Sequence, residues 1–261
     1  LALITEVTCR LILKPNIERS VLCGFSDPNQ AIKMLSEIRQ LGIQPSIAEF
    51  MLDICVEASS KYLKTDPMFS RSKAYIIWQF DGFDEQSVQS QINKIEEISN
   101  MLDCDQWLPL DSHSLRHHVW EIRRNISLGL KLLAGDKYSE DIVVPPSKVS
   151  LVIHELNNLS HESGIHVIGY GHLGDGNIHV NILKMNTLDD VWRNTIELVV
   201  DKVMSIAVKY GGSISGEHGI GLTKKKYMKY IFSETDLFIM KSIKSIIDPN
   251  NILNPGKIFD S

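Results

Sequence analysis

The alternation of apolar and polar residues divides the first 101 residues into strands and helices. An alternating pattern rich in β-branched residues predicts strands at residues 1–13, 20–25, 44–50 and 74–80. Apolar residues at helical spacing predict helices at residues 30–41, from about 51 to 63, and at 84–101. This order is typical of an α+β fold, in which helices cover a large and mainly antiparallel sheet.

The same two patterns continue through the rest of the chain. Helices are predicted at residues 112–133, 147–163 and 186–210, and a short strand broken by prolines at 139–146. Two short strands flank a glycine-rich turn between residues 166 and 183, and a second glycine-rich strand and turn follows at 213–221. Residues 246–259 form a compact segment punctuated by prolines.

The first glycine-rich turn carries two histidines. Asp175-Gly176 favours a two-residue hairpin turn, because both turn positions adopt positive φ. With that turn, His172 lies directly opposite His179, with Cβ atoms about 4.5–5.5 Å apart, so that the two imidazoles could share one metal ion. Asn181 points to the same face as His179. The alternative is a tight hairpin whose polar residues are incidental.

The predicted helix at 112–133 places Trp120, Arg123 and Ser127 on one face. An arginine guanidinium binds a carboxylate with two parallel hydrogen bonds, so this face suits a carboxylate anchor. The alternative is an ordinary amphipathic helix with a solvated Arg123-Arg124 pair.

The second glycine-rich segment carries Glu217 and His218 side by side. On extended backbone, adjacent side chains point to opposite faces. We therefore expect Glu217 to face a metal and His218 to face a substrate. The alternative is a polar turn before a helix that begins at Thr223.

Composition narrows the class of protein. The chain has 261 residues, 43% of them hydrophobic, and a net charge of −5, which suits one large domain or one and a half smaller ones. The scattered lysines give no nucleic-acid footprint, and no apolar run approaches the ~18–20 residues that span a bilayer. The four cysteines include no Cys-x-x-Cys pair, so we expect buried thiols in a reducing compartment. A cytoplasmic location is therefore expected, with peripheral attachment to the inner face of a membrane left open.

Four motifs together resemble one family. They are Gly-Tyr-Gly-His172-x-Gly-Asp-Gly-Asn-x-His179, Ser-Gly-Glu217-His218-Gly-Ile-Gly, Trp120-x-x-Arg123 and Asp-Pro-x-x-Ile-Leu-Asn254-Pro-Gly-Lys. Over nearly its whole length the chain is similar to the C-terminal domain of FAD-linked 2-hydroxyacid oxidases and dehydrogenases, which have the vanillyl-alcohol-oxidase type of fold. Members include D-lactate dehydrogenase, the glycolate oxidase flavin subunit and D-2-hydroxyglutarate dehydrogenase.

The resemblance implies three parts. Residues 1–16 would be the last strand and linker of an FAD-binding domain that is otherwise missing, and residues 17–240 a ferredoxin-like cap domain that binds substrate and metal. Residues 241–261 would return to the flavin domain. Three residues in the outer parts would contact FAD: Thr5, Glu6 and Asn254. The isolated chain would lack stable FAD and be inactive.

The resemblance also implies roles within the site. His172, His179 and Glu217 match the ligands of a divalent metal, zinc or manganese, and His218 matches the catalytic base. The implied substrate-binding residues are Arg123 for the carboxylate, with Trp120, Ser127 and Asn181. The implied reaction is oxidation of a D-2-hydroxy acid to a 2-oxo acid by hydride transfer to FAD. A hydroxyl bound to a metal becomes more acidic, and a histidine can then remove its proton.

One position departs from the 2-hydroxyglutarate branch. That branch has a lysine two residues before the aspartate that matches Asp141, where this chain has Ser139. The missing cation favours a monocarboxylate such as lactate or glycolate, unless Lys137 substitutes for it. The electron acceptor, and whether the chain forms a homodimer or joins partner oxidase subunits, stay open. Two other functions compete: a zinc-dependent hydrolase that uses the same His–His–Glu set, and a non-catalytic metal- or partner-binding module.

Overall fold

The computed structural model of the chain describes residues 3–69, 71–172 and 174–259. Its first half contains β1 (Ile17–Phe25), α1 (Pro28–Gln40), β2 (Ile47–Leu52), α2 (Asp53–Leu63), β3 (Ala74–Gly82), α3 (Glu85–Met101) and β4 (Cys104–Pro109). Its second half contains α4 (His113–Arg124), α5 (Ile126–Ala134), β5 (Lys137–Val143), α6 (Val149–Ser163), β6 (His166–His172), β7 (Asn177–Leu183), α7 (Asp189–Lys209) and α8 (Glu234–Ile247). Short 3-10 helices lie at Pro146–Lys148 and Lys225–Tyr230.

The strands of the described residues form one sheet in the order β4-β1-β3-β2-β6-β7-β5, in which the paired neighbours are antiparallel. This confirms the predicted α+β class with a mainly antiparallel sheet. The order β4-β1-β3-β2, with crossover helices α1 and α3, is that of a ferredoxin-like unit. The unit joins the second half through a short pairing in which Glu49 of β2 faces His172 of β6.

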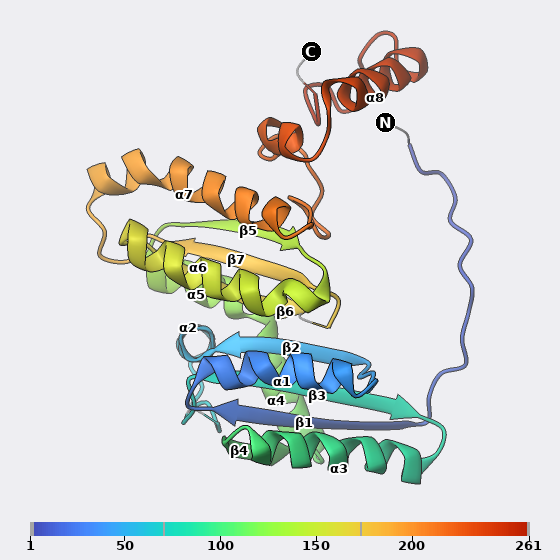
Figure 1. Cartoon of the computed structure of the whole chain (residues 1–261), viewed down its shortest axis with the longest axis vertical. Coiled ribbons are helices and arrows are strands. Elements are labelled where there is room, and N and C mark those ends of the chain that lie inside the picture. Colours follow the sequence, from blue (N-terminus) through green and yellow to red (C-terminus); the bar gives the residue numbers. More distant parts are fainter. Residues whose placement is uncertain (1–2, 70, 173, 260–261) are drawn as a thin grey trace.

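Helices cover both faces of the sheet, because successive strand residues alternate between two apolar clusters. On β2, Ala48 and Phe50 belong to the larger cluster, which α1, α3, α6 and α7 cover. Met51 belongs to the other cluster, which is covered by α2, α4 and α5. Figure 1 shows these helices in front of and behind the sheet. The alternation directs Glu49 to the second face, toward α4.

The predicted helix at 112–133 is two helices with a break at Asn125. Asn125 has φ −96° and ψ 7°, and its side-chain Nδ2 donates to the backbone oxygen of Glu121 at 2.9 Å. Asparagine competes for backbone groups in this way, and so favours helix ends over helix interiors. Strand β4 and helix α8 are absent from the sequence prediction. The described residues of α8 include none that is fully buried, and its partly buried Leu237 and Met240 pack against the larger apolar cluster.

The N-terminal segment differs from its prediction. Its described residues 3–15 form no strand, and Leu3, Ile4 and Leu11 are exposed. A strand needs a neighbour to pair with its backbone N–H and C=O groups, and no strand of the described chain runs beside this segment. The strand prediction for these residues is therefore wrong for this chain, and residues 1 and 2 lie outside the described part. In Figure 1 the segment runs from β1 toward α8.

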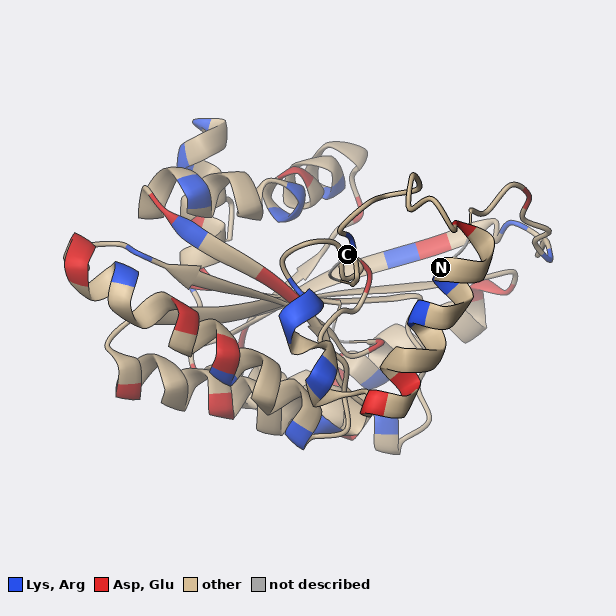
Figure 2. Cartoon of the chain, turned by 90° about the horizontal axis from the view of Figure 1, so that it is seen from above, with Lys and Arg blue, Asp and Glu red and all other residues tan. Residues whose placement is uncertain are grey.

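Surface charge, helix hydrophobicity and cysteine burial can be compared with the sequence analysis. Figure 2 shows Lys and Arg mixed with Asp and Glu over the helices. None of the described helices combines the length and the apolar character needed to cross a membrane. Cys23 and Cys55 are buried as expected, whereas Cys104 is half-buried and Cys9 is exposed.

Candidate metal and substrate site

The β6–β7 hairpin brings its two histidines together in a different register from the predicted one. Tyr170, not His172, lies opposite His179. The strands end at His172 and resume at Asn177, so the connection is longer than two residues. Gly176 has a φ of +88°, but Asp175 is not among the described residues with positive φ. The imidazoles of His172 and His179 still meet diagonally, with ring centroids 5.1 Å apart.

Gly171 permits this diagonal contact. Its φ is +141°, and an added Cβ would lie 3.0 Å from Cδ2 of His179. A side chain at this position would therefore press against the imidazole.

The segment that follows α7 is not the predicted strand but a turn built around Asp141 of β5. Ser213 forms an isolated bridge with Val143. Beyond it, one carboxylate oxygen of Asp141, Oδ2, accepts hydrogen bonds from three consecutive backbone N–H groups, each at 2.9 Å: those of Gly216, Glu217 and His218. Asp141 is fully buried. Burial raises its pKa, but these backbone donors and nearby positive charge outweigh burial, so the pKa of Asp141 lies below its usual range.

Because this segment is a turn, Glu217 and His218 converge instead of facing opposite sides. Atoms able to bind a metal in Asp141, His179, Glu217 and His218 all lie within 4.8 Å of one another. Oε1 of Glu217 is 3.8 Å from Nε2 of His179 and 3.6 Å from Nε2 of His218. The rings of His179 and His218 stack with centroids 5.7 Å apart. His172 adjoins this group through its ring contact with His179.

The donor set fits a divalent metal. Imidazole nitrogens and carboxylate oxygens are ligands that zinc and manganese accept. Burial lowers the pKa of His179, and the charges of Arg123 and His172 act in the same direction, which favours the neutral ring that a metal requires. The buried oxygen Oδ1 of Asp141 has no hydrogen-bond partner among the described residues. A cation beside this oxygen would satisfy it.

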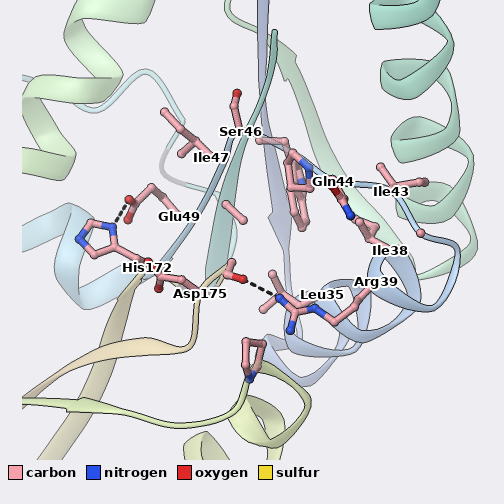
Figure 3. Close-up of a pocket in the computed structure, with 16 residues that line it drawn as sticks. Leu35, Ile38, Arg39, Ile43, Gln44, Ser46, Ile47, Glu49, His172 and Asp175 are labelled. Atoms are coloured by element: carbon pink, nitrogen blue, oxygen red, sulfur yellow. Dashed lines mark hydrogen bonds and ion pairs between the residues drawn. The ribbon is translucent and has the colours of Figure 1, made fainter. Parts of the chain in front are cut away.

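A carboxylate that the sequence analysis did not assign links the metal group to the carboxylate anchor. Glu49 is buried, and its Oε2 accepts a hydrogen bond from Nε of Arg123 at 2.8 Å and lies 2.6 Å from Nη2. Its Oε1 contacts Nδ1 of His172 (Figure 3). Burial raises the pKa of Glu49, but the hydrogen bond with His172 and the charge of Arg123 outweigh it, so the net pKa is lowered. Glu49 and His172 also border a cavity of about 600 Å³.

Lys137 brings a second cation to the site. Its Nζ donates to Oγ of Ser127 at 2.8 Å and to Oδ1 of Asn181 at 2.9 Å. Burial lowers the pKa of Lys137 to about 8, with Lys131 adding to the effect. Lys137 therefore lies beside two of the predicted substrate-binding residues, Ser127 and Asn181, where it could take the place of the missing lysine. The choice between a monocarboxylate and a dicarboxylate stays open at this position.

The remaining predicted residues lie farther from this centre or carry other contacts. Trp120 is half-buried and packs against the apolar cluster under α4. Thr5 and Glu6 are exposed in the N-terminal segment, and Asn254 is exposed with a φ of +47°. Asn254 and Leu3 border one cavity of about 380 Å³, together with residues of α8. Their contacts with substrate or FAD stay predictions.

The model of a known family, described as FAD linked oxidases, C-terminal domain, matches residues 14–258. The chain belongs to this family. The match confirms the resemblance drawn from the four motifs. Among curated FAD-linked oxidase relatives, the chain is 28% identical to D-lactate dehydrogenase of Anaerostipes hadrus, with 99% of this chain and 55% of the relative covered.

Two further relatives widen the range of substrates within the FAD-linked oxidases. The chain is 28% identical to glycolate oxidase subunit GlcD of Bacillus subtilis, covering 99% of this chain and 54% of the relative. It is 32% identical to a probable mitochondrial D-2-hydroxyglutarate dehydrogenase of Oryza sativa subsp. japonica, covering 99% of this chain and 46% of the relative. The chain spans about half the length of the curated relatives it matches.

Solved structures support the fold. The structure of p-cresol methylhydroxylase with bound substrate matches with a TM-score of 0.68 at 13% identity, over 94% of this chain and 53% of that one. A 4-ethylphenol oxidase from Gulosibacter chungangensis matches with a TM-score of 0.66 at 13% identity, over 95% of this chain and 55% of that one. At this identity the likeness concerns the fold alone.

Proposed function

We propose that this chain is the substrate- and metal-binding part of a flavin-dependent oxidoreductase that converts a D-2-hydroxy acid into its 2-oxo acid. One observation carries the proposal: His179 and Glu217 belong to a group able to hold a metal, His172 contacts His179, and two cationic side chains lie beside them in a chain of the FAD-linked oxidase family. The group supplies metal ligands, and the cations suit an acidic substrate. A 2-hydroxy acid bound here would thus have metal ligands near its hydroxyl and cationic side chains near its carboxylate.

Each side chain has a role that its chemistry suits. His172, His179 and Glu217 would hold zinc or manganese, which when bound would make the substrate hydroxyl more acidic. A ring nitrogen of His218 would take the hydroxyl proton, and its exposed ring can return that proton to water. As the C2–O bond becomes a carbonyl, the C2 hydrogen leaves as hydride, which FAD would accept when bound. Arg123 would orient the carboxylate.

The exposed apolar residues at the two ends of the chain suit contact with a flavin-binding part. Leu11 and Ile12 of the N-terminal segment and Phe238 and Ile246 of α8 are at least two-thirds exposed. Exposed apolar residues that gather into a patch often mark an interaction surface. Residues 1–16 and 241–261 would therefore pack on the flavin-binding part, where Thr5, Glu6 and Asn254 would approach the FAD.

The contacts of Lys137 support a proposed substrate class that includes dicarboxylates as well as lactate and glycolate. Its ammonium group contacts a hydroxyl and an amide, and no carboxylate of the described residues forms an ion pair with it. A second carboxylate on the substrate could take that place, as in D-2-hydroxyglutarate, which one relative's name includes. Exchange of Lys137 for Met should raise the KM for D-2-hydroxyglutarate at least tenfold more than the KM for D-lactate. An equal change for both substrates would argue for monocarboxylates.

The reaction itself is tested with the FAD-loaded protein that contains this chain. We expect a yellow protein that reduces a redox dye with a D-2-hydroxy acid and not with the L-enantiomer. A colourless protein that hydrolyses esters or amides would establish the zinc hydrolase instead. A protein that binds zinc but has neither activity would favour a metal- or partner-binding module. The GlcD-type names include the word subunit, so co-purification with other chains should be examined in the same preparation.

A further inference from the structure

Glu49 lies in the interior of the sheet, where burial of a carboxylate is normally unfavourable. It is 5% exposed and pairs in register with Ile77 on one side and His172 on the other. An isolated buried carboxylate is strongly unfavourable unless it is paired and hydrogen-bonded. Glu49 meets this condition by giving each of its oxygens a different partner: Arg123 at Oε2 and His172 at Oε1.

The contact with Glu49 determines how His172 can act. The ion pair with Arg123 holds the Glu49 carboxylate as an acceptor, so Nδ1 of His172 is the nitrogen that donates to Oε1. In the neutral ring the lone pair then lies on Nε2, the nitrogen that remains for a metal. Carboxylates orient metal-binding histidines in this way in many metal sites. The same ring stands edge-on to His179, with ring centroids 5.1 Å apart. The orientation that Glu49 gives His172 therefore also sets its position relative to the metal group.

The contact with Glu49 also determines which edge of Arg123 is available. The edge formed by Nε and Nη2 is occupied by Glu49. The guanidinium is held over the ring of Tyr170, with Cζ 5.1 Å from the ring centroid. A substrate carboxylate must therefore approach from the other side of the guanidinium, at Nη1. The Nε–Nη2 edge, which could form a two-bond clamp with a carboxylate, is thus taken by the protein itself.

We propose that Glu49 is a positioning residue that fixes the metal ligand His172 and the substrate anchor Arg123 through one carboxylate. This assignment rests on the proposed function for its purpose. Glu49 touches neither substrate nor metal in this scheme. It sets the tautomer of one neighbour and the orientation of the other, and thereby fixes the distance between the two parts of the site.

Exchange of Glu49 for Gln provides a specific test, because a glutamine side chain has one acceptor and one donor. Arg123 has only donors and will turn the Gln oxygen toward itself. The Gln NH2 group must then face Nδ1 of His172, which has to become an acceptor, so the proton of the ring moves to Nε2. The variant should thus reverse the tautomer of His172 with almost no change in size.

The readout is the tautomer of His172 by ¹⁵N NMR in the metal-free chain, at a pH where the ring is neutral, together with calorimetric binding of Zn²⁺ alone. The wild type should carry its proton on Nδ1. The Glu49→Gln variant should carry it on Nε2 and bind Zn²⁺ about 10–100-fold more weakly. In the double variant Glu49→Gln with Arg123→Met, the Gln oxygen is free to turn to His172, and the wild-type tautomer should return.

A wild-type proton on Nε2 would overturn the assignment without any variant. An unchanged tautomer and unchanged Zn²⁺ affinity in a folded Glu49→Gln variant would also overturn it and leave Glu49 as a counter-ion for Arg123 only. Neither measurement needs FAD. A chain that passes both tests while the flavin-loaded protein oxidises no 2-hydroxy acid would contradict the proposed function and leave the positioning role of Glu49 standing.

Discussion

Asp141 holds the turn that carries Glu217 and His218, and the exchange of Asp141 for Asn should loosen that turn. The change keeps the shape of the side chain and removes its charge. Three backbone N–H groups donate to Oδ2 of Asp141 at 2.9 Å each. A hydrogen bond to a charged group is worth about 1 kcal/mol more than one to a neutral group. Water can partly replace the acceptor, because the donor residues are exposed, so the expected loss is about 2–3 kcal/mol of unfolding free energy.

Two assays follow this loss. Denaturant unfolding should show a lower midpoint for Asp141→Asn, whereas Asp81→Asn, which alters an exposed carboxylate, should stay within about 0.5 kcal/mol of the wild type. Hydrogen exchange should quicken at the amides of residues 216–218 in Asp141→Asn.

The pH dependence has a definite sign. The folded pKa of Asp141 is lowered, so its contribution to stability is present above the usual value of 3.8 and is lost as the pH falls below it. The difference between wild type and Asp141→Asn should therefore shrink below pH 3.8. Equal midpoints at neutral pH, with unchanged exchange at residues 216–218, would show that the charge of Asp141 does not hold this turn.

Three further predictions concern the same site. Gly216→Ala should disturb the turn and weaken Zn²⁺ binding in calorimetry, because its Cβ would lie 2.6 Å from Oδ1 of Asn177; the roomier Gly174→Ala, at 3.3 Å from Ala48, should bind nearly as the wild type does. The folded pKa of Lys137 is about 8, so the KM for an acidic substrate should rise as the pH passes through 8, and Lys137→Arg should move that rise to higher pH; if KM changed with pH in the same way in both proteins, Lys137 would not be the group that binds the acidic substrate. His179→Ala should abolish Zn²⁺ binding by the chain, whereas the exposed His166→Ala should not; retained binding would remove His179 from the ligands.

The parts of the site that the sequence predicts are those carried by short motifs. His172 and His179 are seven residues apart on one hairpin, and Glu217 and His218 are neighbours, so local patterns suffice to single them out. The register of the hairpin is harder to predict. Asp175-Gly176 indicates a tight turn, but the connection between the strands is longer, and the histidines meet diagonally.

The supporting residues depend on contacts that are distant in sequence. Glu49 lies 74 residues from Arg123 and 123 from His172, and Asp141 lies 75 to 77 residues from the N–H groups it holds. Strand pairing creates these contacts, and one sequence does not reveal the pairing. A signal nevertheless exists. Glu49 interrupts the apolar run from Ile47 to Leu52, and Asp141 directly precedes the apolar residues 142–144. An acidic residue that is buried in such a strand requires partners.

The prediction for the N-terminal segment fails for a different reason. Its alternating pattern is genuine, but a pattern specifies which face a strand would bury, not whether a neighbouring strand exists. Residues 3–14 are exposed, and residues 3–15 pair with no described strand. The apolar residues of α8 are divided between the core and the surface: Leu237 and Met240 pack against the larger apolar cluster, whereas Phe238 and Ile246 are exposed.

In the proposed function, the metal group prepares a 2-hydroxy acid for hydride loss to FAD. The most direct measurement is the bleaching of the oxidised flavin under anaerobic conditions, when the FAD-loaded protein is mixed with D-lactate or D-2-hydroxyglutarate. We expect bleaching with the metal-loaded protein, its loss after chelation, and its return when zinc or manganese is restored. A flavin that stays oxidised with every D-2-hydroxy acid would exclude this reaction, and bleaching that chelation leaves unchanged would exclude a role for the metal.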